Sequence, residues 1–267
     1  MLQSITNYEH LHVQREDALL WVRISRPQTR NALSRAALAE LGAVFAAHAE
    51  DSALKAAVLT GEGDKAFAAG GDLKDFAQVR TVEDTTALFD GAWTALEQVR
   101  RFPVPVVAAL NGLAVGGGAE LALACDFRVA AATASMGYIQ GRLGISSGFG
   151  GGADLMRLLG PSKALLHVLR AEVLDATQAR AVGLVDEIAA PTESLESCVR
   201  RFLEPMLRQT PQVIRAYKAL ALAVRRGTSI NELQRVEREG FVATWNHPDH
   251  WAAVDRLVGR DDKESKR

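Results

Sequence analysis

The chain has 267 residues, 48% of them apolar, and its 31 lysines and arginines nearly balance 32 aspartates and glutamates, for a formal net charge of −1 at pH 7. That length suffices for one large domain, with or without a small appendage, around a sizeable core. The charge balance excludes a protein that binds nucleic acid by neutralising many phosphates, and no apolar run reaches the ~20 residues of a membrane-spanning helix. We therefore expect a small-molecule partner.

Short apolar segments alternate with amphipathic ones in the first half of the chain. Leu19–Ile24 (LLWVRI) has the composition of a strand, and Ser34 is placed to cap a helix whose apolar residues recur on one face. Further buried strands are predicted over Ala56–Thr60, Val104–Leu110 and Phe127–Ala131. This alternation predicts an α/β fold.

The sequence changes character from about Leu155 onward. Long stretches of Ala, Leu and Arg follow, and candidate capping residues stand at Pro161, Asp175, Thr177 and Thr210. The pattern predicts a helical C-terminal third, for which we expect contacts between subunits. The two cysteines, Cys125 and Cys198, stand far apart in a chain without an apolar N-terminal leader, which favours a reducing, cytoplasmic location with both thiols buried.

Three consecutive glycines, Gly116–Gly118, precede a lone carboxylate at Glu120. Glycine lets backbone N–H groups approach a ligand, and the start of a helix carries unpaired donors and partial positive charge. Glu120 follows Gly117 by three positions, so a helix places both on one face. Because the carboxylate has apolar neighbours on both sides, it is expected to be functional or paired rather than solvated.

A second glycine corner lies in KAFAAGGDLKDF, where Gly70 and Gly71 precede Asp72, a candidate helix cap. Two such corners can supply two N–H donors to one carbonyl oxygen, which is an oxyanion hole. Together with Glu120 they predict enolate chemistry.

Other patterns are interpreted as structural. GISSG (144–148) matches a nucleophile elbow and GFGGGA (148–153) a dinucleotide fingerprint, but the preceding GRLG is a poor strand, so a packing corner is expected. The HxxH pair at 247–250 contains Pro248, and no metal is predicted. Phe89, Trp93 and Leu96 have helical spacing and are expected in the core or the wall of an acyl pocket.

As a set, five segments make the chain resemble the enoyl-CoA hydratase/isomerase (crotonase) superfamily. They are RPQTRNALS (26–34), KAFAAGGDL (65–73), PVPVVAALNGLAVGGGAELALACDFRVA (103–130), LGISSGFGGGADLMRLLG (143–160) and ARAVGLVDEI (179–188). The resemblance implies a spiral of β-β-α turns over about residues 1–200, a helical trimerisation region over 201–267, and a coenzyme A thioester substrate with no separate cofactor. It also implies a homotrimer or a dimer of trimers.

The resemblance assigns the oxyanion donors to Gly71 and Gly117 and a catalytic acid to Glu120. Contacts to coenzyme A are expected from the Ala68–Leu73 segment, namely Ala68, Ala69, Gly70, Asp72 and Leu73. The second glutamate of the hydratases falls twenty positions after Glu120, where this chain has Gln140. An amide can orient water but cannot exchange a proton at ordinary pH, so chemistry with one acid–base group is expected.

Two alternatives stay open from the sequence. The YIQGRLG segment also resembles superfamily members that decarboxylate methylmalonyl- or ethylmalonyl-type thioesters. If residues 138–142 are extended, Tyr138, Gln140 and Arg142 share a face that recognises a substrate carboxylate, although Glu120 would repel that group. The other alternative is a catalytically silent acyl-CoA-binding protein.

Overall fold

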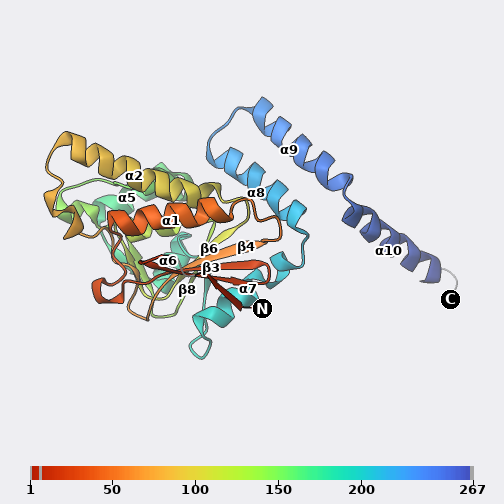
Figure 1. The fold of residues 1–267 in the computed structure, drawn as a ribbon, viewed down its shortest axis with the longest axis horizontal. Helices are drawn as coiled ribbons and strands as arrows, with labels where there is room; N and C mark the ends of the chain where they lie inside the picture. Colours follow the sequence, from red (N-terminus) through yellow and green to blue (C-terminus); the bar gives the residue numbers. More distant parts are fainter. Residues whose placement is uncertain (1, 6–7, 265–267) are drawn as a thin grey trace. The chain divides into compact units, whose positions relative to one another are not determined.

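The computed structural model describes residues 2–5 and 8–264. The chain divides into two compact units, Met1–Pro205 and Met206–Arg267, and each is described by itself. Figure 1 shows both units along the chain.

The described part of the first unit contains a seven-stranded sheet in the order β1-β2-β3-β4-β6-β8-β11. The strands are β1 (Leu2–Ile5), β2 (Leu11–Glu16), β3 (Leu19–Ile24), β4 (Ala56–Gly61), β6 (Val106–Leu110), β8 (Phe127–Ala130) and β11 (Glu187–Ile188). The pairs β1–β2 and β2–β3 are antiparallel, and the sheet is parallel from β3 onward. Every residue of β4 and β6 is buried, as expected of parallel strands covered on both faces.

A smaller sheet, in the order β10-β9-β7-β5, forms the second layer of the described unit. Its strands are β10 (Val173–Asp175), β9 (Ser135–Gly137), β7 (Leu113–Val115) and β5 (Ala66–Ala68). The chain visits the large sheet, then the small one, and then forms a helix, in the successions β4-β5-α2 and β6-β7-α3. This is the expected spiral of β-β-α turns.

Helices and short 3₁₀ turns connect the strands of this unit. They are η1 (Pro27–Thr29), α1 (Arg35–His48), η2 (Asp75–Gln78), α2 (Val82–Arg101), α3 (Gly117–Ala124), η3 (Gln140–Leu143), α4 (Gly151–Leu159), α5 (Pro161–Arg170) and α6 (Ala176–Val182). Helix α1 lies alongside α2 over the large sheet (Figure 1). The Ser34 hydroxyl accepts from the Ala37 N–H at 3.2 Å, which confirms the predicted cap of α1.

The sequence predicted four strands of the large sheet and missed the others, among them the six-residue β2. Leu19–Ile24 is a strand with the predicted bounds, and the other three predicted strands lie within two residues of β4, β6 and β8. The three-residue strands of the small sheet are too short to show periodicity. The region predicted as helical also contains β10 and β11.

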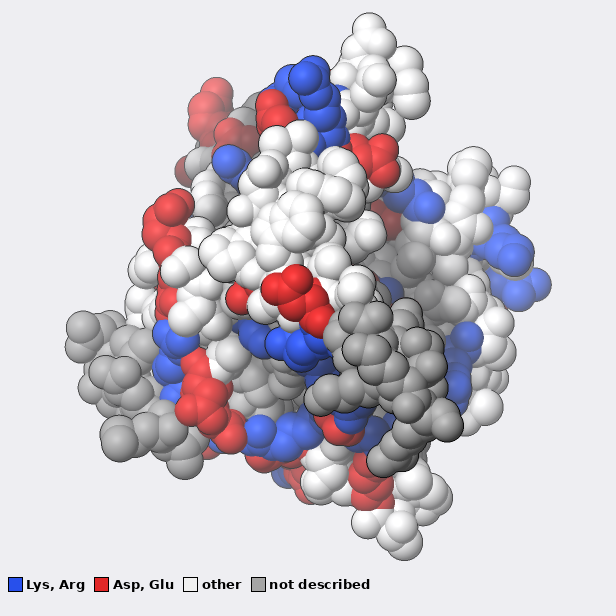
Figure 2. Space-filling model, turned by 90° about the vertical axis from the view of Figure 1, so that its right-hand side faces the viewer, with Lys and Arg blue, Asp and Glu red and all other residues white. Residues whose placement is uncertain are grey.

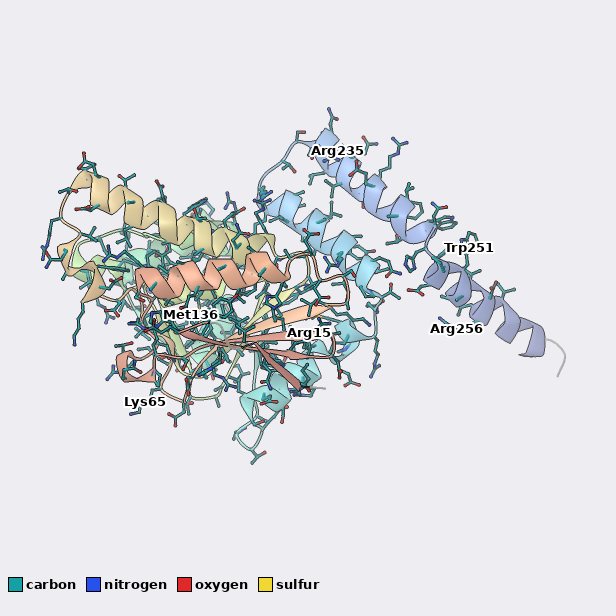
Figure 3. All side chains as sticks on the ribbon, viewed as in Figure 1. Arg15, Lys65, Met136, Arg235, Trp251 and Arg256 are labelled. Carbon is teal, nitrogen blue, oxygen red and sulfur yellow. The ribbon has the colours of Figure 1, made fainter. Side chains whose placement is uncertain are left out.

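Helix α7 (Leu195–Leu207) spans the end of the first unit and the start of the second, which contains α8 (Pro211–Arg225), α9 (Ile230–Trp245) and α10 (Pro248–Glu264). Helices α8 and α9 pack closely where Gly240 faces Ala216. A Cβ on Gly240 would lie only 3.0 Å from the Cβ of Ala216, so glycine permits this approach. Arg235 lies on α9, and Trp251 and Arg256 lie on α10 (Figure 3). Within the described chain, no helix is long and apolar enough to cross a membrane. Figure 2 shows acidic and basic side chains interspersed on one face, as the net charge suggests.

Candidate active site

Three strands of the small sheet bring separate segments to one edge. Strands β5, β7 and β9 run parallel and adjacent, with Ala68 opposite Ala114 and Val115 opposite Gly137. The segments that follow these strands therefore leave the sheet together. They carry Gly71, Gly117 and Gln140, in an arrangement that commonly forms ligand sites in parallel sheets.

The two glycine corners meet at this edge. Gly70 and Gly116 have φ values of +98° and +55°, which glycine adopts far more readily than other residues. A Cβ on Gly70 would lie only 3.8 Å from the nitrogen of Gly117. Among the described residues, no acceptor takes a hydrogen bond from the N–H of Gly71 or Gly117. The edge therefore presents two unpaired backbone donors, one of them at the N-terminus of α3.

The third glycine of the triplet has a different role. A Cβ on Gly118 would lie 1.9 Å from the carbonyl oxygen of Ala68, so only glycine lets α3 start this close to the end of β5. Gly116 makes the turn, Gly117 presents its N–H, and Gly118 permits the close approach.

Glu120 lies one turn into α3, is 1% exposed, and accepts hydrogen bonds from five donors. Its Oε2 accepts from Ser147 Oγ at 2.7 Å, Phe149 N at 2.9 Å and Gly151 N at 2.8 Å, and its Oε1 from Gln140 Nε2 at 2.8 Å and Gly148 N at 3.2 Å. A buried carboxylate requires such partners to offset the loss of water. Glu120 is thus paired, as its apolar flanks indicated.

The two oxygens of this carboxylate are not equivalent. Three donors within 2.9 Å saturate Oε2, whereas Oε1 has one short bond, from Gln140, and one longer bond. An ionised carboxylate only accepts, so the amide nitrogen of Gln140 must face it and the amide oxygen faces away. No donor in the described chain reaches Gln140 Oε1. The Gln140 amide oxygen therefore has both lone pairs available, and Oε1 is the less crowded of the two Glu120 oxygens.

The carboxylate-recognising face considered for residues 138–142 does not form. Gln140–Leu143 is a 3₁₀ turn, η3, so this part of the segment is not extended. Tyr138 and Gln140 are buried while Arg142 is exposed, and the Tyr138 hydroxyl donates to the Gly151 carbonyl at 3.1 Å. Burial, and then the charge of Glu120, raises the pKa of Tyr138 well above its ordinary value, so the phenol stays protonated.

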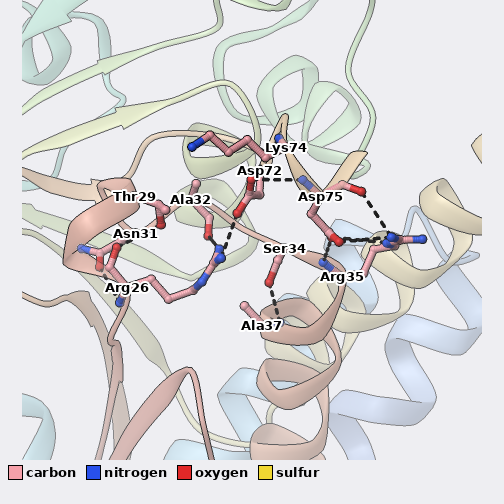
Figure 4. A network of polar contacts seen from close by, with 10 residues as sticks. All are labelled: Arg26, Thr29, Asn31, Ala32, Ser34, Arg35, Ala37, Asp72, Lys74 and Asp75. Carbon is pink, nitrogen blue, oxygen red and sulfur yellow. Dashed lines mark hydrogen bonds and ion pairs between the residues drawn. The ribbon is translucent and has the colours of Figure 1, made fainter. Parts of the chain in front are cut away.

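Asp72 anchors the other corner (Figure 4). Its carboxylate accepts from Arg26 Nη2 at 2.8 Å and from the N–H groups of Lys74 and Asp75 at 3.1 and 3.3 Å, where η2 begins. Burial alone would raise the pKa of Asp72, but the Arg26 and backbone hydrogen bonds outweigh it and leave the pKa below its usual value. Asp72 therefore binds N–H groups at the start of η2 but is not its capping residue, since η2 is a 3₁₀ turn whose N-cap is Lys74.

The remaining residues expected to contact coenzyme A differ in exposure. Ala68 and Gly70 are buried, Ala69 is half-buried, and the Leu73 side chain is 64% exposed. The N–H of Ala69 donates to the Arg30 carbonyl at 3.1 Å.

Sequence reasoning missed Ser147 and Phe149 as partners of Glu120. Both lie in the GISSGFGGGA stretch, where a 3₁₀ turn rather than a strand precedes the glycines. The stretch is a packing corner, as predicted, and its packing partner is the carboxylate itself. A glycine-rich loop next to a buried acid was the available signal, but the two segments lie 27 or more residues apart.

Comparison with known proteins relates the chain to one family. The family model for enoyl-CoA hydratase/isomerase matches residues 14–258. A crotonyl-CoA hydratase from Syntrophomonas wolfei is 35% identical over 236 residues, covering 88% of this chain and 89% of that protein. A short-chain-enoyl-CoA hydratase from Clostridium acetobutylicum is 31% identical over 250 residues, covering 92% and 93%.

Solved structures agree. An enoyl-CoA hydratase from Bacillus anthracis superposes with a TM-score of 0.84 at 31% identity, covering 97% of each chain. An enoyl-CoA hydratase/carnithine racemase from Magnetospirillum magneticum gives a TM-score of 0.87 at 27% identity, covering 95% of this chain and 94% of that one. The chain belongs to the enoyl-CoA hydratase/isomerase family.

Proposed function

We propose that this protein is an enoyl-CoA hydratase-like lyase that adds water to the double bond of an enoyl-CoA thioester through an enolate. Family membership and the hydratase relatives support the reaction class. The observation that carries the proposal is the pair of unpaired N–H groups, on Gly71 and Gly117, at the sheet edge that also presents Glu120 and Gln140.

In this proposal the two N–H groups bind the thioester oxygen. When water attacks the β-carbon, the electron pair of the double bond moves to the α-carbon and onto that oxygen, giving the enolate. Fixed donors stabilise the developing charge without reorganisation, and one of them typically contributes about 3 kcal/mol. Placing Gly117 at the first position of α3 adds the positive end of the helix dipole.

Glu120 serves as the single acid–base group. Its Oε1 accepts a proton as water attacks the β-carbon and then returns a proton to the α-carbon, which leaves the carboxylate ionised again. Gln140 orients the water through its amide oxygen, while its amide nitrogen holds Glu120. Oε1 is assigned this role because Oε2 is saturated by Ser147, Phe149 and Gly151.

Substrate binding and assembly complete the proposal. The backbone of Ala68–Leu73 contacts the coenzyme A portion, and the reaction needs no further cofactor because coenzyme A arrives with the substrate. The helices of the second unit form the contacts of a homotrimer or of a dimer of trimers.

Decarboxylation of a malonyl-type thioester is the weaker candidate. It requires a site for the substrate carboxylate, and Tyr138 and Arg142 do not form one: the first is bonded to Gly151 and the second is exposed. The charge of Glu120 also opposes a second carboxylate at short range.

The test is a direct assay of the purified chain. With crotonyl-CoA, we expect loss of the enoyl absorbance and formation of 3-hydroxybutyryl-CoA by mass spectrometry. Carbon dioxide release from methylmalonyl-CoA, with crotonyl-CoA unchanged, would establish the decarboxylase instead. Tight binding of several acyl-CoA thioesters without turnover of any would establish the silent binding protein.

A further inference from the structure

A phenylalanine ring lies against each of the two donor glycines. A Cβ on Gly71 would lie 2.4 Å from Cε2 of Phe76, and a Cβ on Gly117 would lie 2.4 Å from Cε2 of Phe149. Both rings therefore fill the space directly beside the glycines whose N–H groups are unpaired. Phe76 lies in η2, and Phe149 lies in the loop before α4.

Phe149 is fixed at both of its peptide groups. Its N–H donates to Glu120 Oε2 at 2.9 Å, and its carbonyl accepts from Arg100 Nη2 at 3.3 Å. Arg100 in turn pairs with Asp154 at 2.8 Å, and both side chains are buried. Movement of the Phe149 backbone would break hydrogen bonds to two buried charged groups, so the backbone that carries this ring is held in place, and the residue is only 6% exposed.

Gly150, the next residue, packs against α2. A Cβ on Gly150 would lie 2.4 Å from the Trp93 ring, and the Arg100 guanidinium stands over that ring at 5.2 Å. The loop thus packs directly on α2 at Trp93, which is itself 41% exposed.

The rings of Phe76 and Phe149 lie next to the donors that would hold the oxygen of a bound thioester. If its oxygen is held by Gly71 and Gly117, the α- and β-carbons must lie within reach of Glu120. Because the Phe149 N–H bonds to that same carboxylate, an acyl chain that extends past the β-carbon toward Glu120 approaches Phe149. A long chain would need the volume that the ring occupies.

We propose that Phe149, with Phe76 at the opposite donor, sets the acyl length and restricts this enzyme to short, crotonyl-sized enoyl thioesters. The inference rests on the proposed function and adds the substrate class and the residue that determines it. Phe149 acts by excluding volume and takes no part in proton transfer.

Binding of unreactive thioesters tests this role of Phe149 without any need for turnover. Calorimetry with butyryl-CoA and decanoyl-CoA should show tighter binding of butyryl-CoA by the wild type. In Phe149→Ala, the affinity for decanoyl-CoA relative to butyryl-CoA should rise about tenfold or more. Phe149→Leu, a milder change in case the first variant folds poorly, should shift the ratio in the same direction by less.

Phe202→Ala is the matched control. Phe202 is a half-buried ring that packs edge-on against Phe127, with centroids 5.4 Å apart, and it contacts neither donor glycine. Its removal should leave the ratio of the two affinities unchanged. A Phe76→Ala variant should raise the ratio as well, because that ring borders the other donor.

Hydration rates with crotonyl-CoA and trans-2-decenoyl-CoA give the second readout, and kcat/KM should shift toward the longer substrate in Phe149→Ala. Equal wild-type affinity for both saturated thioesters, or an unchanged ratio in both Phe149 variants, would overturn the inference. If the ratio of affinities shifts while no enoyl-CoA is hydrated, the role of Phe149 in acyl length is supported and the proposed hydratase activity is refuted. If crotonyl-CoA is hydrated and the ratio does not shift, the hydratase activity is supported and the role of Phe149 in acyl length is refuted.

Discussion

Gly151 and Glu120 lie so close that a Cβ on Gly151 would stand 2.4 Å from the Cβ of Glu120. The Gly151 N–H donates to Glu120 Oε2 at 2.8 Å from the first residue of α4. The carboxylate therefore sits at the positive end of a second helix, which favours its charge. Any side chain at 151 would separate the helix from the acid.

The same contact explains the glycine run that resembles a dinucleotide fingerprint. Gly150 has φ +83°, which turns the chain into α4, and Gly151 lets the helix approach Glu120. The run accommodates an internal anion, the carboxylate of Glu120, instead of an external phosphate.

Removal of the Gly117 N–H should abolish most activity. A proline at 117 suits the first position of a helix, but its ring would meet Phe149, so the variant is made in the Phe149→Ala background. We expect kcat/KM for crotonyl-CoA to fall about 100- to 1,000-fold relative to Phe149→Ala alone. Gly117→Ala in the same background keeps the N–H and should retain most activity. Similar rates in the proline and alanine variants would contradict the assignment of this donor.

Glu120→Gln should impair both stability and turnover. Each oxygen of the Glu120 carboxylate accepts at least two hydrogen bonds. Whichever oxygen the new NH₂ group replaces, it therefore faces at least two N–H or O–H donors and cannot accept from them. We expect the free energy of unfolding to drop by about 3 kcal/mol, and kcat to fall by roughly 100- to 10,000-fold. Urea denaturation and the crotonyl-CoA assay measure the two effects.

Ser147→Ala is the control for that variant. It removes one of the five donors to Glu120, so it should lower the free energy of unfolding by only about 1 kcal/mol and leave most activity. A Glu120→Gln protein as stable as the wild type would show that the five hydrogen bonds do not hold this side chain.

Asp72→Asn should destabilise the protein in a pH-dependent manner. Because the pKa of Asp72 is lower in the folded chain, its stabilising contribution is complete above the unfolded value and is lost as pH falls through the folded value. We expect a difference in unfolding free energy of about 2 kcal/mol between wild type and variant at neutral pH. That difference should stay constant down to about pH 5 and shrink below about pH 4. A difference that grows as the pH falls would refute the ion pair with Arg26.

The buried pair of Arg100 and Asp154 should behave as a unit. Their side chains are 6% and 4% exposed, so Asp154→Ala leaves a buried guanidinium without its main partner and should lower the free energy of unfolding by about 3 to 5 kcal/mol. Replacing both, as Arg100→Met with Asp154→Leu, should recover more than half of that loss. A double-mutant cycle by chemical denaturation measures the coupling, and purely additive effects would exclude it.

The features predicted from the sequence are local ones. The Ser34 cap and the strand at Leu19–Ile24 depend on neighbouring residues and on periodicity along the chain, and the structure has both. The spacing that puts Glu120 one turn after Gly117 follows from helix geometry alone. The extended conformation considered as one possibility for residues 138–142 does not occur, because the chain turns at Gln140 into η3, which is followed by Gly144 with φ +68°.

By itself, the sequence determined the fold class, the two glycine corners, and the presence of Gln140 where the family resemblance leads one to expect a second glutamate. Only the tertiary structure decided that the corners meet, because their convergence depends on the register of three-residue strands that carry no pattern of their own. It also decided how Glu120 is held, since its partners at Ser147, Phe149 and Gly151 come from a loop distant in sequence. Contacts between distant segments arise from packing of the whole domain, and no local rule specifies them.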